Sequence, residues 1–293
     1  MRAMNYYHPA VLITYFAAVL VIAMFVANPL LQIFALIGGI LFCAMLCGRR
    51  GAGGDIAFYA CLFFLITVTN PIFSHNGVTP LFFLNGNPVT LEAFVYGAAI
   101  AVMVIAVIIW CKCYSKIMTT DKFLYLFSGF IPKLSLVLSM ALRFIPMFKR
   151  QMKRVSHAQR AMGLYSSKSY IDKIREYCKV FSAVVAWAME NSVQISSVMK
   201  AKGYSVKKRT SFSLFKFKKG DVALACVTAV LLAVTLAGVL SGATVFYYYP
   251  EISNINLSVG SALTYSAFFI LSFLPFIIEV KEAVVWRYCV SKV

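Results

Sequence analysis

The chain alternates between long apolar runs and shorter polar segments. Six runs have the length, or nearly the length, that a helix needs to cross roughly 30 Å of bilayer hydrocarbon. They lie near residues 10–27, 30–47, 56–70, 92–112, 221–241 and 259–280. This pattern predicts an all-α polytopic membrane protein with about six transmembrane helices.

The stretch between the fourth and fifth runs has a different pattern. Its first part, residues 134–148, is apolar, but Arg143 and Pro146 interrupt it before it reaches the length of a span. We therefore expect an oblique or interfacial helix there. The interpretation of Arg143 stays open, because a long cationic side chain can extend to the membrane interface or can anchor the region that follows.

Two amphipathic helices are predicted after Pro146. In the first, basic and apolar residues recur at three- and four-residue intervals on different faces. The basic residues are Lys149, Arg150, Lys153, Arg154 and His157, and the apolar ones are Ile145, Phe148, Met152 and Val155. The apolar stripe of the second comprises Phe181, Val184, Val185, Ala188, Ile195, Val198 and Met199.

These patterns divide the chain into three regions. Residues 1–112 form the N-terminal membrane helices, 113–220 an interfacial and cytoplasmic region, and 221–293 the C-terminal membrane helices. Trp110 and Trp286 lie near the predicted inner ends of spans and are interpreted as interfacial anchors.

Charge indicates an orientation for the spans. Hydrophobic residues make up 61% of the chain, and its formal net charge is +18. None of the 28 Lys and Arg residues lies in the loops at 27–29, 70–91 and 242–258, whereas 22 lie between Lys112 and Lys219. Because basic loops stay on the cytoplasmic side, both termini are predicted to be cytoplasmic. Basic residues beside spans face an anionic leaflet, so this charge does not indicate nucleic acid.

The same short pattern closes both amphipathic helices. It is Arg160-Ala161-Met162-Gly163 in the first helix and Lys200-Ala201-Lys202-Gly203 in the second. Each glycine is expected to end its helix with positive φ, and the basic residues suit the negative end of the helix dipole. Ordinary capping is one interpretation of either copy. Two copies favour a pair of matched docking ends.

The sequence offers little for catalysis or for a transport path of its own. No phosphate-binding G-x-x-x-x-G-K-[ST] loop is present, and His8, His75 and His157 are too scattered for a metal motif. The acidic residues near spans fall at predicted span ends; they are Asp55, Glu92, Asp221 and Glu279. A stand-alone permease and, less readily, a membrane-embedded enzyme remain the alternatives.

Several short motifs, in a fixed order along the chain, resemble those of a known family. They are His8-Pro9, Asn28-Pro29, "DKF" at 121–123, "LRFIP" at 142–146, "AQRAMG" at 158–163 and "MKAKGY" at 199–204. Together they resemble the transmembrane T component of energy-coupling factor (ECF) transporters, prokaryotic importers of vitamins and transition-metal ions.

The resemblance implies a non-catalytic, multi-pass subunit of the prokaryotic inner membrane. Its implied partners are two cytoplasmic ATPases, which bind the ATP, and a substrate-binding S component; the chain itself would bind no cofactor and no metal. The implied ATPase-coupling motifs are the two four-residue patterns, with Arg143 and Pro146 supporting them.

The chain departs from the family pattern in two places. The family's motif is Ala-Arg-Gly, but the central residue here is Met162 in the first copy and Lys202 in the second. Lysine keeps a cation and methionine does not, so Arg160 or apolar packing would replace that contact at the first end. The C-terminal region adds a span beyond the family's usual last one.

Overall fold

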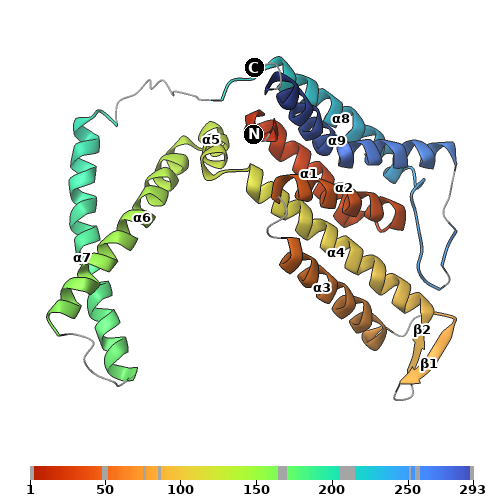
Figure 1. The fold of residues 1–293 in the computed structure, drawn as a ribbon, viewed down its shortest axis with the longest axis horizontal. Coiled ribbons are helices and arrows are strands. Elements are labelled where there is room, and N and C mark those ends of the chain that lie inside the picture. Colours follow the sequence, from red (N-terminus) through yellow and green to blue (C-terminus); the bar gives the residue numbers. More distant parts are fainter. Residues whose placement is uncertain are drawn as a thin grey trace. The chain divides into compact units, whose positions relative to one another are not determined.

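The computed structural model describes residues 3–47, 52–74, 77–84, 87–163, 170–204, 215–250, 252–254 and 258–290. Within these ranges the chain forms nine α-helices, a short 3₁₀ helix at Ala3–Tyr6 and one β-hairpin (Figure 1). It divides into two compact units. The first comprises Met1–Phe123 and Phe215–Val293, and the second comprises Leu124–Leu214.

The first unit contains the membrane helices, which confirms the predicted all-α polytopic class. Five helices of the described residues are long and apolar enough to cross a membrane. They are α2 (Pro29–Cys47), α3 (Ala52–Phe73), α4 (Leu91–Ile117), α8 (Lys219–Leu240) and α9 (Val259–Val290). The first of the six predicted spans is α1 (Pro9–Phe25), which is apolar but has only 17 residues.

The His-Pro and Asn-Pro motifs lie at the starts of helices α1 and α2. The His8 Nδ1 atom accepts a hydrogen bond from the Ala10 N–H at 3.3 Å, and the Asn28 Oδ1 atom accepts one from the Leu30 N–H at 3.1 Å. In each pair the proline occupies the first helical position, where a missing N–H costs nothing. These two motifs, which resemble part of a family signature, thus also have a local structural role, because each starts a helix.

These caps also connect distant parts of the first unit. The His8 N–H donates to Asp221 Oδ1 at 2.9 Å, at the start of α8. The Asn28 side-chain amide donates to the Tyr265 hydroxyl of α9 at 2.9 Å. Buried polar groups are therefore paired between helices that lie more than 200 residues apart in sequence.

Trp110 is a core residue, and the prediction that it anchors the membrane interface is wrong. Its side chain is fully buried, and its indole N–H donates to the Ala35 carbonyl of α2 at 2.9 Å. The rings of Tyr15, Phe16 and Phe42 lie within 6.2 Å of it, centroid to centroid. An amphipathic ring suits either environment, and the carbonyl partner here permits burial.

Two features near the acidic residues were not predicted. Within the predicted outer loop 70–91, Pro80–Leu84 (β1) and Asn87–Thr90 (β2) pair as an antiparallel hairpin. Helix α9 continues beyond Glu279 to Val290, and the Glu279 carboxylate is buried, where it accepts a hydrogen bond from the Met4 N–H at 3.3 Å.

The "DKF" motif lies at the start of α5 (Thr120–Phe130). Lys122 is buried, and its ammonium donates to the Ile117 carbonyl in the last turn of α4 at 3.2 Å. A cation is favoured at this negative end of a helix. Burial lowers the pKa of Lys122, since the interior disfavours its charged form.

Candidate functional site

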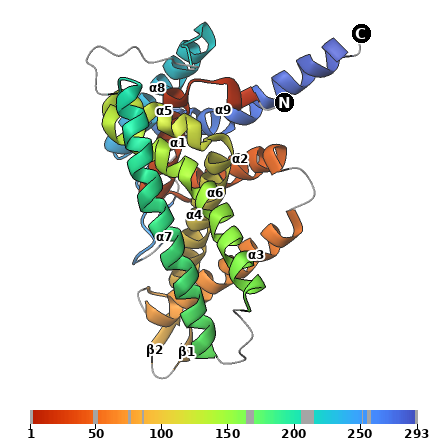
Figure 2. The same cartoon turned by 90° about the vertical axis from the view of Figure 1, so that its left-hand side faces the viewer.

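The second unit is built on two long helices, α6 (Pro132–Ala161) and α7 (Tyr170–Ala201). Figures 1 and 2 show them side by side, and Figure 1 shows that they run in opposite directions. They meet near their middles, where the Phe148 and Trp187 rings contact edge to face at 6.0 Å. Val180 and Val184 of α7 are buried. Two amphipathic helices were predicted here, and both are present.

Helix α6 passes through Pro146 without a break. The sequence predicted an oblique helix up to Pro146 and an amphipathic helix after it, and one helix of 30 residues contains both parts. Pro146 lies on the exposed side of the helix, so the hydrogen bond it cannot make costs less than in a buried turn. The two ends of α6 therefore belong to one continuous element.

The end of α6 has the predicted glycine cap. The Met162 N–H donates to the Ala158 carbonyl at 3.2 Å, and the Gly163 N–H donates to the Arg160 carbonyl at 3.0 Å. Gly163 has φ +85°, a conformation that glycine adopts without strain. Arg160, Ala161, Met162 and Gly163 are all exposed. The first predicted motif is thus an exposed helix end of fixed backbone geometry.

The end of α7 repeats this geometry. The Lys202 N–H donates to the Val198 carbonyl at 2.9 Å, and the Gly203 N–H donates to the Lys200 carbonyl at 3.0 Å. Gly203 has φ +72°. The Tyr204 N–H adds a bond to the Met199 carbonyl at 3.1 Å, which completes a Schellman cap. Lys200, Ala201 and Lys202 are exposed, and Gly203 is half-buried.

The equivalent residues of the two ends can be matched from their hydrogen bonds. Arg160 corresponds to Lys200, since the carbonyl of each accepts from the glycine N–H. Met162 corresponds to Lys202, whose N–H groups bond four residues back in both helices. The two ends therefore share one backbone conformation, and the substitution of Met162 for Lys202 changes only the side chain at that position.

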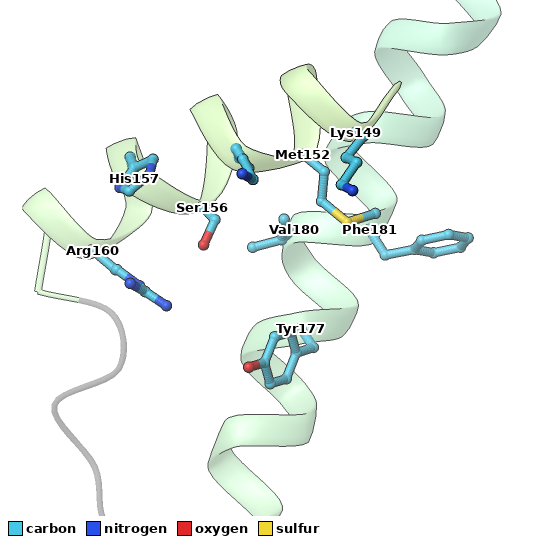
Figure 3. Close-up of a pocket in the computed structure, with 9 residues that line it drawn as sticks. Lys149, Met152, Ser156, His157, Arg160, Tyr177, Val180 and Phe181 are labelled. Carbon is cyan, nitrogen blue, oxygen red and sulfur yellow. The ribbon is translucent and has the colours of Figure 1, made fainter. Parts of the chain in front are cut away.

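A groove beside the C-terminal end of α6 is lined by several basic side chains of that helix. It has a volume of about 620 Å³ and is hereafter the basic groove. Figure 3 shows Arg160 and Ser156 of α6 pointing toward Tyr177 and Val180 of α7. The lining residues are Lys149, Met152, Lys153, Ser156, His157, Arg160, Tyr177, Val180 and Phe181.

A second groove, beside the end of α7, joins Arg143 to Lys202. It has a volume of about 520 Å³, and its lining includes Met199 and Tyr204 as well as these two cations. Arg143 and Lys202 lie 59 positions apart in the chain. The sequence gives no sign that these two residues are close, because no local signal reports how two antiparallel helices align. Pro146 lines neither groove.

Some predicted features fall outside the described residues. His75, one of the three scattered histidines, is among them. Many large apolar side chains of the predicted α7 stripe stay exposed, with Phe181 at 60% and Val198 at 51%. Val184 is the stripe residue that is buried. Ala188, Ile195 and Met199 are half-buried, so the stripe is only partly covered in this chain.

Comparison with known proteins gives a family and several relatives. The family model "CbiQ: Cobalt transport protein" matches residues 7–212. The energy-coupling factor transporter transmembrane protein EcfT 1 of Listeria monocytogenes is 25% identical over 58% of this chain and 68% of its own length. The EcfT protein of Listeria innocua is 30% identical over 34% of this chain and 39% of its own.

A relative from Mycoplasma pneumoniae, the uncharacterized protein MG181 homolog, is 27% identical over 37% of this chain. The chain spans only 26% of the length of that protein. The family match, in contrast, covers both the N-terminal membrane helices and the two helix ends of the second unit. Because it extends over more than half of the 293 residues, the chain belongs to the CbiQ family of cobalt transport proteins.

Proposed function

We propose that this chain is the transmembrane coupling component of an ECF-type importer. In this proposal the ends of α6 and α7 dock on two cytoplasmic ATPases, and the membrane helices carry a substrate-binding S component. Support comes from the family match, from the Listeria relatives named as EcfT proteins, and from the multi-pass first unit. The family is a non-catalytic one of transporter membrane subunits.

The observation that carries the proposal is the pair of equivalent helix ends. One helix cap needs no function, because glycine closes many helices. Here the same capping bonds recur at Gly163 and Gly203, both ends are largely exposed, and the helices that carry them contact each other at Phe148 and Trp187. Two copies of one shape suit two copies of one receptor.

The proposed mechanism uses the continuity of α6 and α7. ATP binding and hydrolysis take place on the ATPases, and this chain binds no nucleotide or metal itself. When the ATPases move, each docked end moves with its receptor. Because each end belongs to an unbroken helix of about 30 residues, the displacement is transmitted along that helix rather than absorbed in a loop.

The docking contacts differ between the ends in this proposal. Lys202 supplies the cation at the α7 end, together with Arg143 from the same groove. Arg160 supplies it at the α6 end, because the equivalent Met162 side chain carries no charge and is 73% exposed. Ala161, Gly163, Lys200, Ala201 and Gly203 shape the two ends, and Pro146 supports α6.

The acidic residues of the first unit favour this function over a stand-alone permease. Glu92 accepts from the Thr79 hydroxyl at 2.7 Å, and Asp221 accepts from the His8 and Lys218 N–H groups at 2.9 and 2.8 Å. These carboxylates have structural partners, whereas a transport path needs ionisable groups that exchange ligands. The S component would then select the substrate, a vitamin or a transition-metal ion.

The first test is whether the chain needs ATPases. Purified alone, it is expected to hydrolyse no ATP. Co-expressed with the ECF-type ATPases of its source, it should retain both through purification, and an S component should complete substrate uptake. Robust hydrolysis by the lone chain, or ATPases that never co-purify with it, would contradict the proposal.

The orientation of the chain forms a separate prediction. We propose that both termini and the second unit are cytoplasmic in the prokaryotic inner membrane. In a cysteine-free background, Asn254→Cys should react with a membrane-impermeant thiol reagent added to intact cells, and Ser197→Cys on exposed α7 should react only after lysis. Labelling of the second variant in sealed cells would reverse the map.

A further inference from the structure

The basic groove has a composition that docking of helix ends does not explain. We propose that it binds one anionic phospholipid, with the phosphodiester against the cations of α6 and the beginning of an acyl chain against the apolar side chains of α7. This inference concerns the chain alone and does not depend on any ATPase.

The cations of the groove share one face of α6. Lys149 and Lys153, which the docking proposal does not use, are four residues apart and lie on the same side of the helix, and Arg160 follows seven residues later at its end. Along the axis these intervals correspond to about 6 Å and about 10 Å. The groove lining contains no Asp or Glu among the residues that the structure describes. Lys149 and Lys153 are one turn apart, so a single phosphodiester can contact both.

The opposite wall suits the uncharged parts of a lipid. Tyr177 of α7 presents a hydroxyl toward the groove, and Ser156 presents another from α6 (Figure 3). Val180 forms an apolar floor at 3% exposure, and Phe181 leaves 60% of its side chain uncovered. The groove thus offers both hydroxyl groups and apolar surface, as the glycerol and acyl parts of a lipid require.

The exposed apolar row on α7 favours a lipid over an acidic protein segment. Tyr170, Ile174, Tyr177 and Phe181 follow at three- and four-residue intervals and are each at least 60% exposed. Basic and apolar faces side by side are typical of helices that bind anionic membranes. The chain is a multi-pass membrane protein, so such lipids always surround it. A partner that matched only the charge would leave this row uncovered.

The test compares two charge-matched variants of the full chain. Lys149→Gln with Lys153→Gln removes two cations that line the groove, and Arg150→Gln with Arg154→Gln removes two exposed cations of the same helix that do not. Each protein is purified in detergent, mixed with phosphatidylglycerol or phosphatidylcholine, and analysed by native mass spectrometry. We expect the parent to retain one phosphatidylglycerol, the groove variant to retain it about 30-fold less, and the control to resemble the parent.

Further arms identify the ligand and exclude other causes. Millimolar glycerol 3-phosphate should displace the lipid weakly, whereas displacement as strong as that by phosphatidylglycerol would mean that the groove binds phosphate groups and not lipid. Equal retention of the two lipids, or equal losses in both double variants, would overturn the proposal. So would unchanged lipid retention with lost ATPase binding in the groove variant, because the ligand would then be a protein. Matching elution volumes and helical circular dichroism establish that both variants fold.

Discussion

A chain carrying Lys202→Glu is expected to retain its ATPase partners at least about 30-fold less than the parent. Reversing a charge in a desolvated, hydrogen-bonded pair at an interface typically costs enough binding energy for such a loss. The variant should still fold, because the cap of α7 uses only the backbone N–H of residue 202. Beside Arg143 in the same groove, the new carboxylate would meet a cation. Co-purified ATPase and substrate uptake, at matched membrane expression, are the measurements.

Met162→Gln is the matched control, since Met162 occupies the equivalent position in the cap of α6. This change keeps the residue uncharged and close to its size, so both readouts should stay near the parent values. At the first end Arg160→Glu should be the damaging substitution, with Arg154→Glu as its control on the same helix. If Lys202→Glu and Arg160→Glu both assemble and transport normally, the charges at these ends do not dock.

Local rules predicted the helices and their ends. Apolar runs of sufficient length predicted α2, α3, α4, α8 and α9 to within a few residues at most boundaries. Gly163 and Gly203 were predicted to close their helices, and both have positive φ. These successes share a cause: the length of an apolar run and the conformation of a capping glycine depend on residues within one or two turns.

Features that depend on tertiary contacts could not be predicted. The environment of Trp110 is set by Ala35 and the rings of α1 and α2, none of which is near it in sequence. Pro146 carries a local signal for a break, but its exposed position within α6 lets the helix continue. Arg143 and Lys202 share a groove only because two antiparallel helices align there.

The docking role of the two ends remains a proposal for the same reason. The sequence shows two similar motifs, and the structure shows that their backbones share capping hydrogen bonds. What each end binds depends on a second protein, whose surface neither the motif nor the cap contains. Variants that change one end at a time can test the role whatever the shape of that surface.

Gly163→Val is expected to lower ATPase retention and uptake by about tenfold or more, while Gly163→Asn should change them little. A residue with a side chain is strained by roughly 1–2 kcal/mol in the left-handed region, and a β-branched residue by more. Gly163 has φ +85°, and no atom lies within 4 Å of the position that a Cβ would occupy. Any loss in the valine variant therefore arises from the backbone and not from a clash.

Asparagine tolerates the left-handed conformation, so Gly163→Asn adds a side chain in the same open space but keeps the cap. The pair of variants separates the shape of the helix end from its size. Amide hydrogen exchange at Met162 and residue 163 should accelerate only in the valine variant, because their N–H groups would lose the Ala158 and Arg160 carbonyls. An end that exchanges faster but still binds both ATPases would show that the cap closes α6 and takes no part in docking.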